Sequence, residues 1–122
     1  MKPIILADDE YYFHTNLVRT LQERIPGVTV DAVWDGNELV EKVQQQDYGV
    51  IITDYNMGIR SPNGLEASES IRKAGVQTPI YLHSTNNFDS VDVSSSGVTK
   101  VFSKDDNSKD LVDAVAELYK DI

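Results

Sequence analysis

Groups able to transfer a phosphoryl group follow four apolar runs of this 122-residue chain. In chain order they are Asp8, Asp9, Glu10, Asp54, Ser84 and Lys104. Converging carboxylates repel one another and resist desolvation unless a cation joins them. Mg²⁺ suits such a set because it binds a few carboxylates and keeps several waters. One carboxylate can then attack a phosphoryl group and form an acyl phosphate, while an ammonium neutralises the charge.

The hydrophobic pattern supplies elements that place these groups. It predicts strands at Pro3–Ala7, Val28–Val33, Val50–Thr53, Pro79–Leu82 and Lys100–Ser103. It predicts helices at Tyr11–Arg24, from about Leu39 to Gln46, at Leu65–Lys73, and after a cap at Asn107 or Ser108. Strands that alternate with helices indicate an α/β fold with a parallel sheet and right-handed crossovers. Ligands of such sheets bind beyond the carboxyl ends of the strands, so we expect the groups at one edge.

Composition excludes or disfavours other kinds of site. The chain has no cysteine, which rules out disulfides and thiolate metal sites. We expect His83 to be buried in its strand and His14 to be partly exposed on its helix. The net charge of −9, without a basic stripe, argues against direct nucleic-acid binding. Apolar runs are too short for a transmembrane helix or a signal peptide, so we expect a cytoplasmic protein without a membrane partner.

Short motifs surround the chemical groups. They are Ile4-Ile5-Leu6-Ala7-Asp8-Asp9-Glu10, Asp35-Gly36, Ile51-Ile52-Thr53-Asp54-Tyr55-Asn56-Met57, Gly64-Leu65-Glu66, Pro79-Ile80 and Lys104. Together they resemble the receiver domain of two-component response regulators, over essentially all of residues 1–122. The resemblance implies a single receiver domain with a flavodoxin-like (βα)5 three-layer sandwich. Its five-stranded parallel sheet would have strand order 2-1-3-4-5 and helices on both faces.

The resemblance also implies a metal site and a phosphoacceptor. Asp54 would accept the phosphoryl group. Asp9 and Asp54 would bind Mg²⁺ directly, with the backbone carbonyl of Asn56 as a further ligand. Asp8 would act mainly through a metal-bound water.

Two more residues would contact the phosphoryl group. Ser84 takes the place of the family's hydroxyl residue, and Lys104 that of the lysine that pairs with the group. The resemblance implies a histidine kinase or histidine phosphotransfer protein as donor, in two-component or phosphorelay signalling. A downstream effector protein or an output domain would read the modified state. We expect a signalling domain that catalyses only its own phosphorylation and slow dephosphorylation, either stand-alone or part of a longer protein.

Two alternatives remain open. Gly58 replaces a usual Pro, Thr85 replaces a usual small residue, and Val101 replaces a frequent aromatic residue. The departures at Gly58 and Thr85 would suit a degenerate receiver that only binds other proteins, whereas Val101 departs from the aromatic switch residue of the family. A small phosphohydrolase with an aspartyl-phosphate intermediate is disfavoured, because Asn56 stands where such enzymes carry a second Asp.

The segment Asn86–Gly97 is poorly suited to form a helix. Its few apolar residues do not make a continuous stripe, and its β-branched valines, three consecutive serines and glycine lower helix propensity. We therefore predict that the helix between Ser84 and Lys104 is short, frayed or replaced by a loop. We also predict that it exchanges its amide hydrogens early and reorders when Asp54 is phosphorylated.

Overall fold

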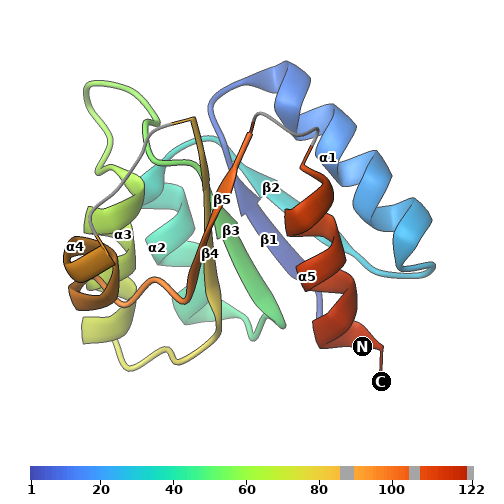
Figure 1. The fold of residues 1–122 in the computed structure, drawn as a ribbon. Helices are drawn as coiled ribbons and strands as arrows, with labels where there is room; N and C mark the ends of the chain where they lie inside the picture. Colours follow the sequence, from blue (N-terminus) through green and yellow to red (C-terminus); the bar gives the residue numbers. More distant parts are fainter. Residues whose placement is uncertain (86–89, 105–107, 121–122) are drawn as a thin grey trace.

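The computed structural model describes residues 1–85, 90–104 and 108–120 and contains one parallel sheet between two layers of helices (Figure 1). The strand order is β2-β1-β3-β4-β5. The strands are β1 Ile4–Ala7, β2 Val30–Val33, β3 Val50–Thr53, β4 Ile80–Ser84 and β5 Lys100–Ser103. The predicted α/β sandwich with order 2-1-3-4-5 is confirmed. The second strand begins later than predicted, because the Val28 amide donates to the Ile25 carbonyl in a turn.

Burial of the strands follows their position in the sheet. All residues of β1, β3 and β4 are buried, because each has a strand on either side and helices over both faces. Continuous apolar runs are typical of such strands. The edge strands β2 and β5 are partly exposed.

Helices cover the two faces unequally. Helices α1 (Tyr11–Arg24) and α5 (Lys109–Tyr119) lie on one face, and α2 (Gly36–Gln45), α3 (Gly64–Lys73) and α4 (Ser90–Ser95) lie on the other (Figure 1). Each layer has its own core. Beneath α1 and α5 the largest buried side chains include Ile4, Leu6, Leu21, Ile52 and Leu111. Beneath α2 and α3 they include Ile5, Leu39, Ile51, Ile71, Ile80 and Leu82.

Helix beginnings are held in different ways. Asp35 caps α2 by accepting a hydrogen bond from the Glu38 amide at 2.8 Å, and Asn63 and Glu66 form a reciprocal capping box at the start of α3. The predicted capping of α5 is wrong for Ser108, and Asn107 lies outside the described residues. Ser108 occupies the N-cap position with φ +62° but makes no side-chain cap bond. Its hydroxyl instead lies 2.9 Å from Nε2 of His83.

Helix α4 is short. Residues 86–89 of the predicted segment lie outside the described residues, and the described part of the helix covers six residues from Ser90, in line with the prediction of a short helix. Arg72 of α3 fixes the chain at the end of this helix. Its guanidinium donates to the carbonyl of Gly97 through Nε and Nη2, and to the carbonyls of Val76 and Thr78 through Nη1, at 2.8–3.1 Å. The turn after α4 is thereby joined to the turn after α3.

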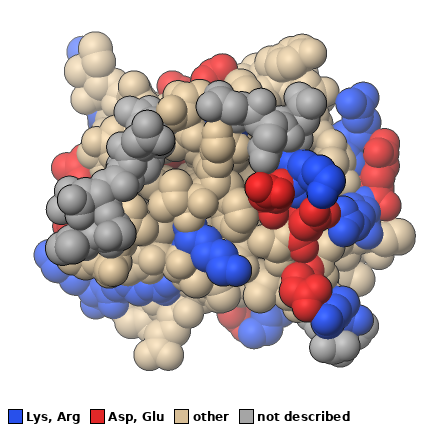
Figure 2. Space-filling view, viewed as in Figure 1, with Lys and Arg blue, Asp and Glu red and all other residues tan. Residues whose placement is uncertain are grey.

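The surface carries charges of both signs. Over α5, acidic and basic side chains lie next to one another (Figure 2). Asp113 pairs there with Arg24 at 2.7 Å and with Lys109 at 3.0 Å. Within the described ranges, no helix has the length and apolar character needed to cross a membrane.

Candidate functional site

The register of the central strands places two carboxylates side by side. Ala7 of β1 pairs with Thr53 of β3, and the Asp54 amide donates to the Ala7 carbonyl at 2.9 Å. Asp8 and Asp54 therefore leave the sheet at the same level. Lys104 follows β5, two strands away from β3, and its long side chain reaches back to them. Its ammonium lies 2.9 Å from Oδ2 of Asp8 and 3.4 Å from Oδ2 of Asp54.

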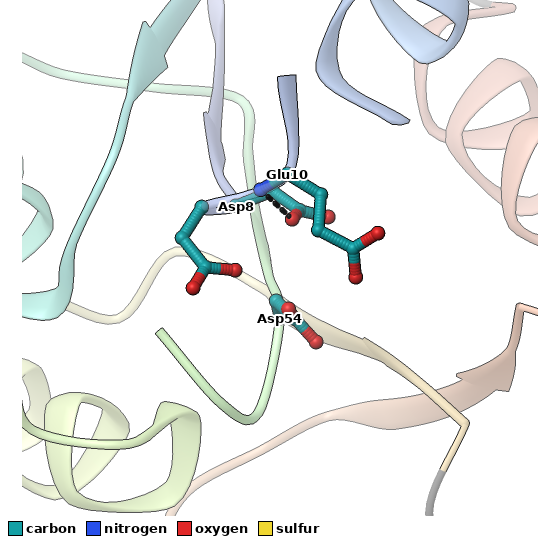
Figure 3. Close-up of side chains that lie close together, drawn as sticks. Asp8, Glu10 and Asp54 are labelled. Carbon is teal, nitrogen blue, oxygen red and sulfur yellow. Dashed lines mark hydrogen bonds between the residues drawn. The ribbon is translucent and has the colours of Figure 1, made fainter. Parts of the chain in front are cut away.

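Asp8 and Asp54 belong to a cluster of four carboxylates. Asp8, Asp9, Glu10 and Asp54 each offer an oxygen, and these oxygens lie within 4.8 Å of one another. Figure 3 shows the side chains of Asp8, Glu10 and Asp54 around one space, with the Glu10 amide donating to Oδ1 of Asp8 at 2.9 Å. Asp8 and Asp54 are buried, whereas Asp9 and Glu10 are exposed. The cluster is thus anchored in the sheet and open to water on its outer side.

The electrostatics of the pair favour an added positive charge. Burial and the neighbouring charge of Asp8 raise the pKa of Asp54 to about 6, against the lowering effect of Lys104 and of the Tyr55 amide. Burial lowers the pKa of Lys104, but its hydrogen bond to Asp8 and the charges of both carboxylates outweigh burial, so the pKa is raised. One ammonium therefore faces two buried carboxylates and two exposed ones. An all-oxygen donor set with a wet side fits Mg²⁺, which keeps part of its water shell.

The remaining predicted site residues lie at the same edge of the sheet. Ser84 ends β4 and is buried, and its carbonyl accepts a hydrogen bond from the Lys104 amide at 3.1 Å. Asn56 is exposed, two residues after Asp54, and its side-chain Oδ1 accepts from the Gly58 amide at 3.3 Å. Thr85 is also exposed. All predicted site residues are thus found beyond the carboxyl ends of β1, β3, β4 and β5.

The loop after Asp54 is folded against the site. The Gly64 amide donates to the Tyr55 carbonyl, and a Cβ at Gly64 would lie 2.4 Å from the backbone oxygen of Asp54, so only glycine fits there. Gly58 adopts φ +106°, a conformation that favours glycine. The hydroxyl of Ser61 accepts a hydrogen bond from the Gly36 amide at 2.8 Å, which joins the loop to the start of α2.

Two aromatic contacts near the site were missed or misjudged from the sequence. The ammonium of Lys104 lies 4.4 Å from the ring centroid of Phe13. Phe13 is the first member of the apolar stripe of α1, and only its place at the sheet edge could have suggested this contact. The prediction of a partly exposed His14 is wrong. Trp34 stacks on its ring at 4.3 Å, and Nε2 of His14 lies 3.0 Å from the Val33 carbonyl oxygen. His83 is buried, as predicted.

Comparisons with known proteins agree with this arrangement. The family model of the response regulator receiver domain matches residues 4–116. Two-component system protein A of Emericella nidulans is 33% identical over 87 residues, 70% of this chain, and the chain spans 12% of that protein's length. The structure of the response regulator protein TrrA from Thermotoga maritima in complex with Mg(2+)-BeF is 30% identical, covers 97% of this chain and 99% of its own, and has a TM-score of 0.83. The chemotaxis protein CheY4 of Vibrio cholerae is 25% identical, with coverage of 97% and 98% and a TM-score of 0.81.

Proposed function

The chain belongs to the response regulator receiver domain family, and from this premise we propose that Asp54 accepts a phosphoryl group in a Mg²⁺-dependent reaction. The observation that carries the proposal is the position of Lys104, whose ammonium contacts Asp8 and Asp54 inside a cluster of four carboxylates. A buried ammonium next to a nucleophilic carboxylate is what a transferring phosphoryl group requires for charge neutralisation.

Binding of the cation would use the carboxylate oxygens. Asp9 and Asp54 would bind Mg²⁺ directly, together with the backbone carbonyl of Asn56, and Asp8 would act mainly through a metal-bound water. When bound, the cation would neutralise negative charge on the phosphoryl oxygens. Exposed Asp9 lies on the wet side of the cluster, which suits exchange of the cation with solvent. The TrrA protein crystallised in complex with Mg(2+)-BeF supports this assignment by similarity.

The transfer itself would be a displacement at phosphorus. An oxygen of Asp54 attacks the phosphorus atom of a phosphohistidine, the P–N bond breaks, and the imidazole nitrogen keeps the electron pair. Lys104 would then move its ammonium from the two carboxylates to a phosphoryl oxygen. The hydroxyl of Ser84, which ends the adjacent strand, would contact another phosphoryl oxygen.

The proposed partners follow from membership of the receiver domain family. The donor would be a histidine kinase or a histidine phosphotransfer protein, and the reader a downstream effector protein or an output domain. We propose one receiver domain over residues 1–122, located in the cytoplasm and acting as a signalling domain that catalyses only its own phosphorylation and slow dephosphorylation.

Phosphorylation by a small donor tests the assignment of Asp54. Incubation with acetyl phosphate and Mg²⁺ should add one phosphoryl group by intact mass, and hydroxylamine should remove it. Asp54→Ala should abolish the addition, whereas Asp47→Ala, a change at an exposed carboxylate, should leave it intact. Equal labelling of the Asp54→Ala protein contradicts the assignment. Absence of labelling in the unaltered protein favours a receiver that only binds other proteins.

A further inference from the structure

The ammonium of Lys104 has an aromatic neighbour in addition to its two carboxylates. The side chain is 3% exposed, and its nitrogen lies 2.9 Å from Asp8, 3.4 Å from Asp54 and 4.4 Å from the ring centroid of Phe13. A cation at this distance from a ring centroid is attracted by the negative charge of the ring face, most strongly where water is excluded. Phe13 comes from α1, whereas Lys104 follows the edge strand β5, so the contact joins two distant parts of the chain.

The ring of Phe13 is itself held in place. It meets the imidazole of His83 edge to face, with centroids 6.3 Å apart and planes at 84°. His83 is 1% exposed, and its Nε2 lies 2.9 Å from the hydroxyl of Ser108 at the start of α5. Phe13, Lys104 and Ser108 also line one groove of about 390 Å³ beside α1. The ring that the ammonium contacts is thus packed against His83 of β4, which Ser108 in turn holds.

A cation bound at the site would compete with Lys104 for its carboxylate partners but not for the ring of Phe13. Any cation that enters the carboxylate cluster draws on the charge of Asp8 and Asp54, and so weakens their hold on Lys104. The ring of Phe13 has no oxygen to offer such a cation and keeps its contact with the ammonium. Because a lysine side chain has a long, flexible stem, loss of its carboxylate partners without another contact would release it into many conformations.

We propose that Phe13 is a positioning residue that holds the Lys104 ammonium at the site when a cation occupies the carboxylate cluster. This inference rests on the proposed phosphorylation of Asp54, which it deepens by naming what keeps the lysine ready for the phosphoryl group. The proposed role requires an aromatic ring face at position 13. Leucine has a similar size but no such face, whereas tyrosine retains it.

Nuclear magnetic resonance of the lysine side chain tests the contact without any reaction. Protons above a ring face are shielded, so the ε-methylene protons of Lys104, assigned with Lys104→Arg, should resonate upfield of those of the exposed lysines. Phe13→Leu should move them downfield, Phe13→Tyr should keep them upfield, and the difference between the two variants should persist when Mg²⁺ is added. Tyr12→Leu is the matched control, since it removes an exposed ring from the same turn. An unchanged Lys104 resonance in Phe13→Leu overturns the proposal.

Kinetics with acetyl phosphate and Mg²⁺ test the consequence. Phe13→Leu should be phosphorylated about three- to tenfold more slowly, in line with the strength of a partly solvated cation–π contact. Phe13→Tyr, which keeps the ring face, should restore the rate. Equal rates for Phe13→Leu and the unaltered protein, both folded by their spectra, overturn the proposal. If the unaltered protein takes up no phosphoryl group, the proposed function fails, and the resonance of Lys104 alone decides whether Phe13 positions it.

Discussion

Removal of the Asp54 charge should stabilise the protein when no divalent cation is present. Asp54 is buried beside Asp8, and the ionised form carries the cost of burial and of repulsion between the two carboxylates. Asp54→Asn keeps the shape of the side chain and removes this cost. We therefore expect the variant to have a higher melting temperature in EDTA at pH 7.

The size of the effect follows from the pKa. A rise of the Asp54 pKa from its ordinary value of 3.8 to about 6 corresponds to about 3 kcal/mol, at about 1.4 kcal/mol per pKa unit. This shift already includes the attraction of Lys104. Screening at the solvent-open edge of the cluster reduces the figure to about 1–2 kcal/mol. For a chain of this length we expect an increase in melting temperature of about 3–8 °C.

The sign of the pH dependence is fixed by the direction of the shift. The folded state holds the Asp54 proton more tightly than the unfolded state, so the unaltered protein loses stability as the pH rises from about 4 through about 6. The advantage of Asp54→Asn should therefore be small at pH 4 and reach its full size by pH 7.

Thermal denaturation at these two pH values, in EDTA, measures the effect. Asp47→Asn is the control, because the Asp47 side chain is 71% exposed and, among the described residues, forms an ion pair with Lys2 alone. It should change the free energy of unfolding by less than about 0.5 kcal/mol. A melting temperature of Asp54→Asn at or below that of the unaltered protein at pH 7, or an equal gain at both pH values, would refute the reasoning.

Three further predictions concern the cation, the chain ends and α4. Asp9→Asn should weaken Mg²⁺ binding in calorimetry yet leave the metal-free protein as stable or more so, and unchanged affinity would contradict the placement of Asp9. Tyr119→Phe should lower the free energy of unfolding in urea by about 1 kcal/mol, because the lost hydroxyl donates to the Lys2 carbonyl at 2.8 Å; an unaltered midpoint would count against this bond. In hydrogen exchange, the amides of α4 should exchange before those of β1. A phosphoryl analogue with Mg²⁺ should change the exchange rates of the α4 amides. Strong protection of α4 that the analogue leaves unaltered would rule out the predicted reordering.

The sheet and its charged edge could be predicted because their signals are local. The runs Val50–Thr53 and Lys100–Ser103 have the bounds predicted for them, and each is followed at once by its chemical residue, Asp54 or Lys104. A parallel sheet gathers such residues at one edge without any knowledge of side-chain contacts.

Contacts between distant elements could not be predicted in the same way. Phe13 has the spacing of a core residue, and its contact with Lys104 depends on how α1 crosses the end of the sheet. His14 is covered by the ring of Trp34, which follows β2 and stacks on it. The hydroxyl of Ser108 faces the His83 ring instead of the first amides of α5, because its backbone is left-handed.

The guanidinium of Arg72 gives α4 a fixed pivot. Its two hydrogen bonds to the Gly97 carbonyl anchor the turn directly after the helix to α3, and a Cβ at Gly97 would lie 2.4 Å from Cγ of Arg72, so the anchor is tightly packed as well. If α4 moves when Asp54 is phosphorylated, the Gly97 end should therefore stay nearly in place, and the end of the helix at Ser90 should be displaced most.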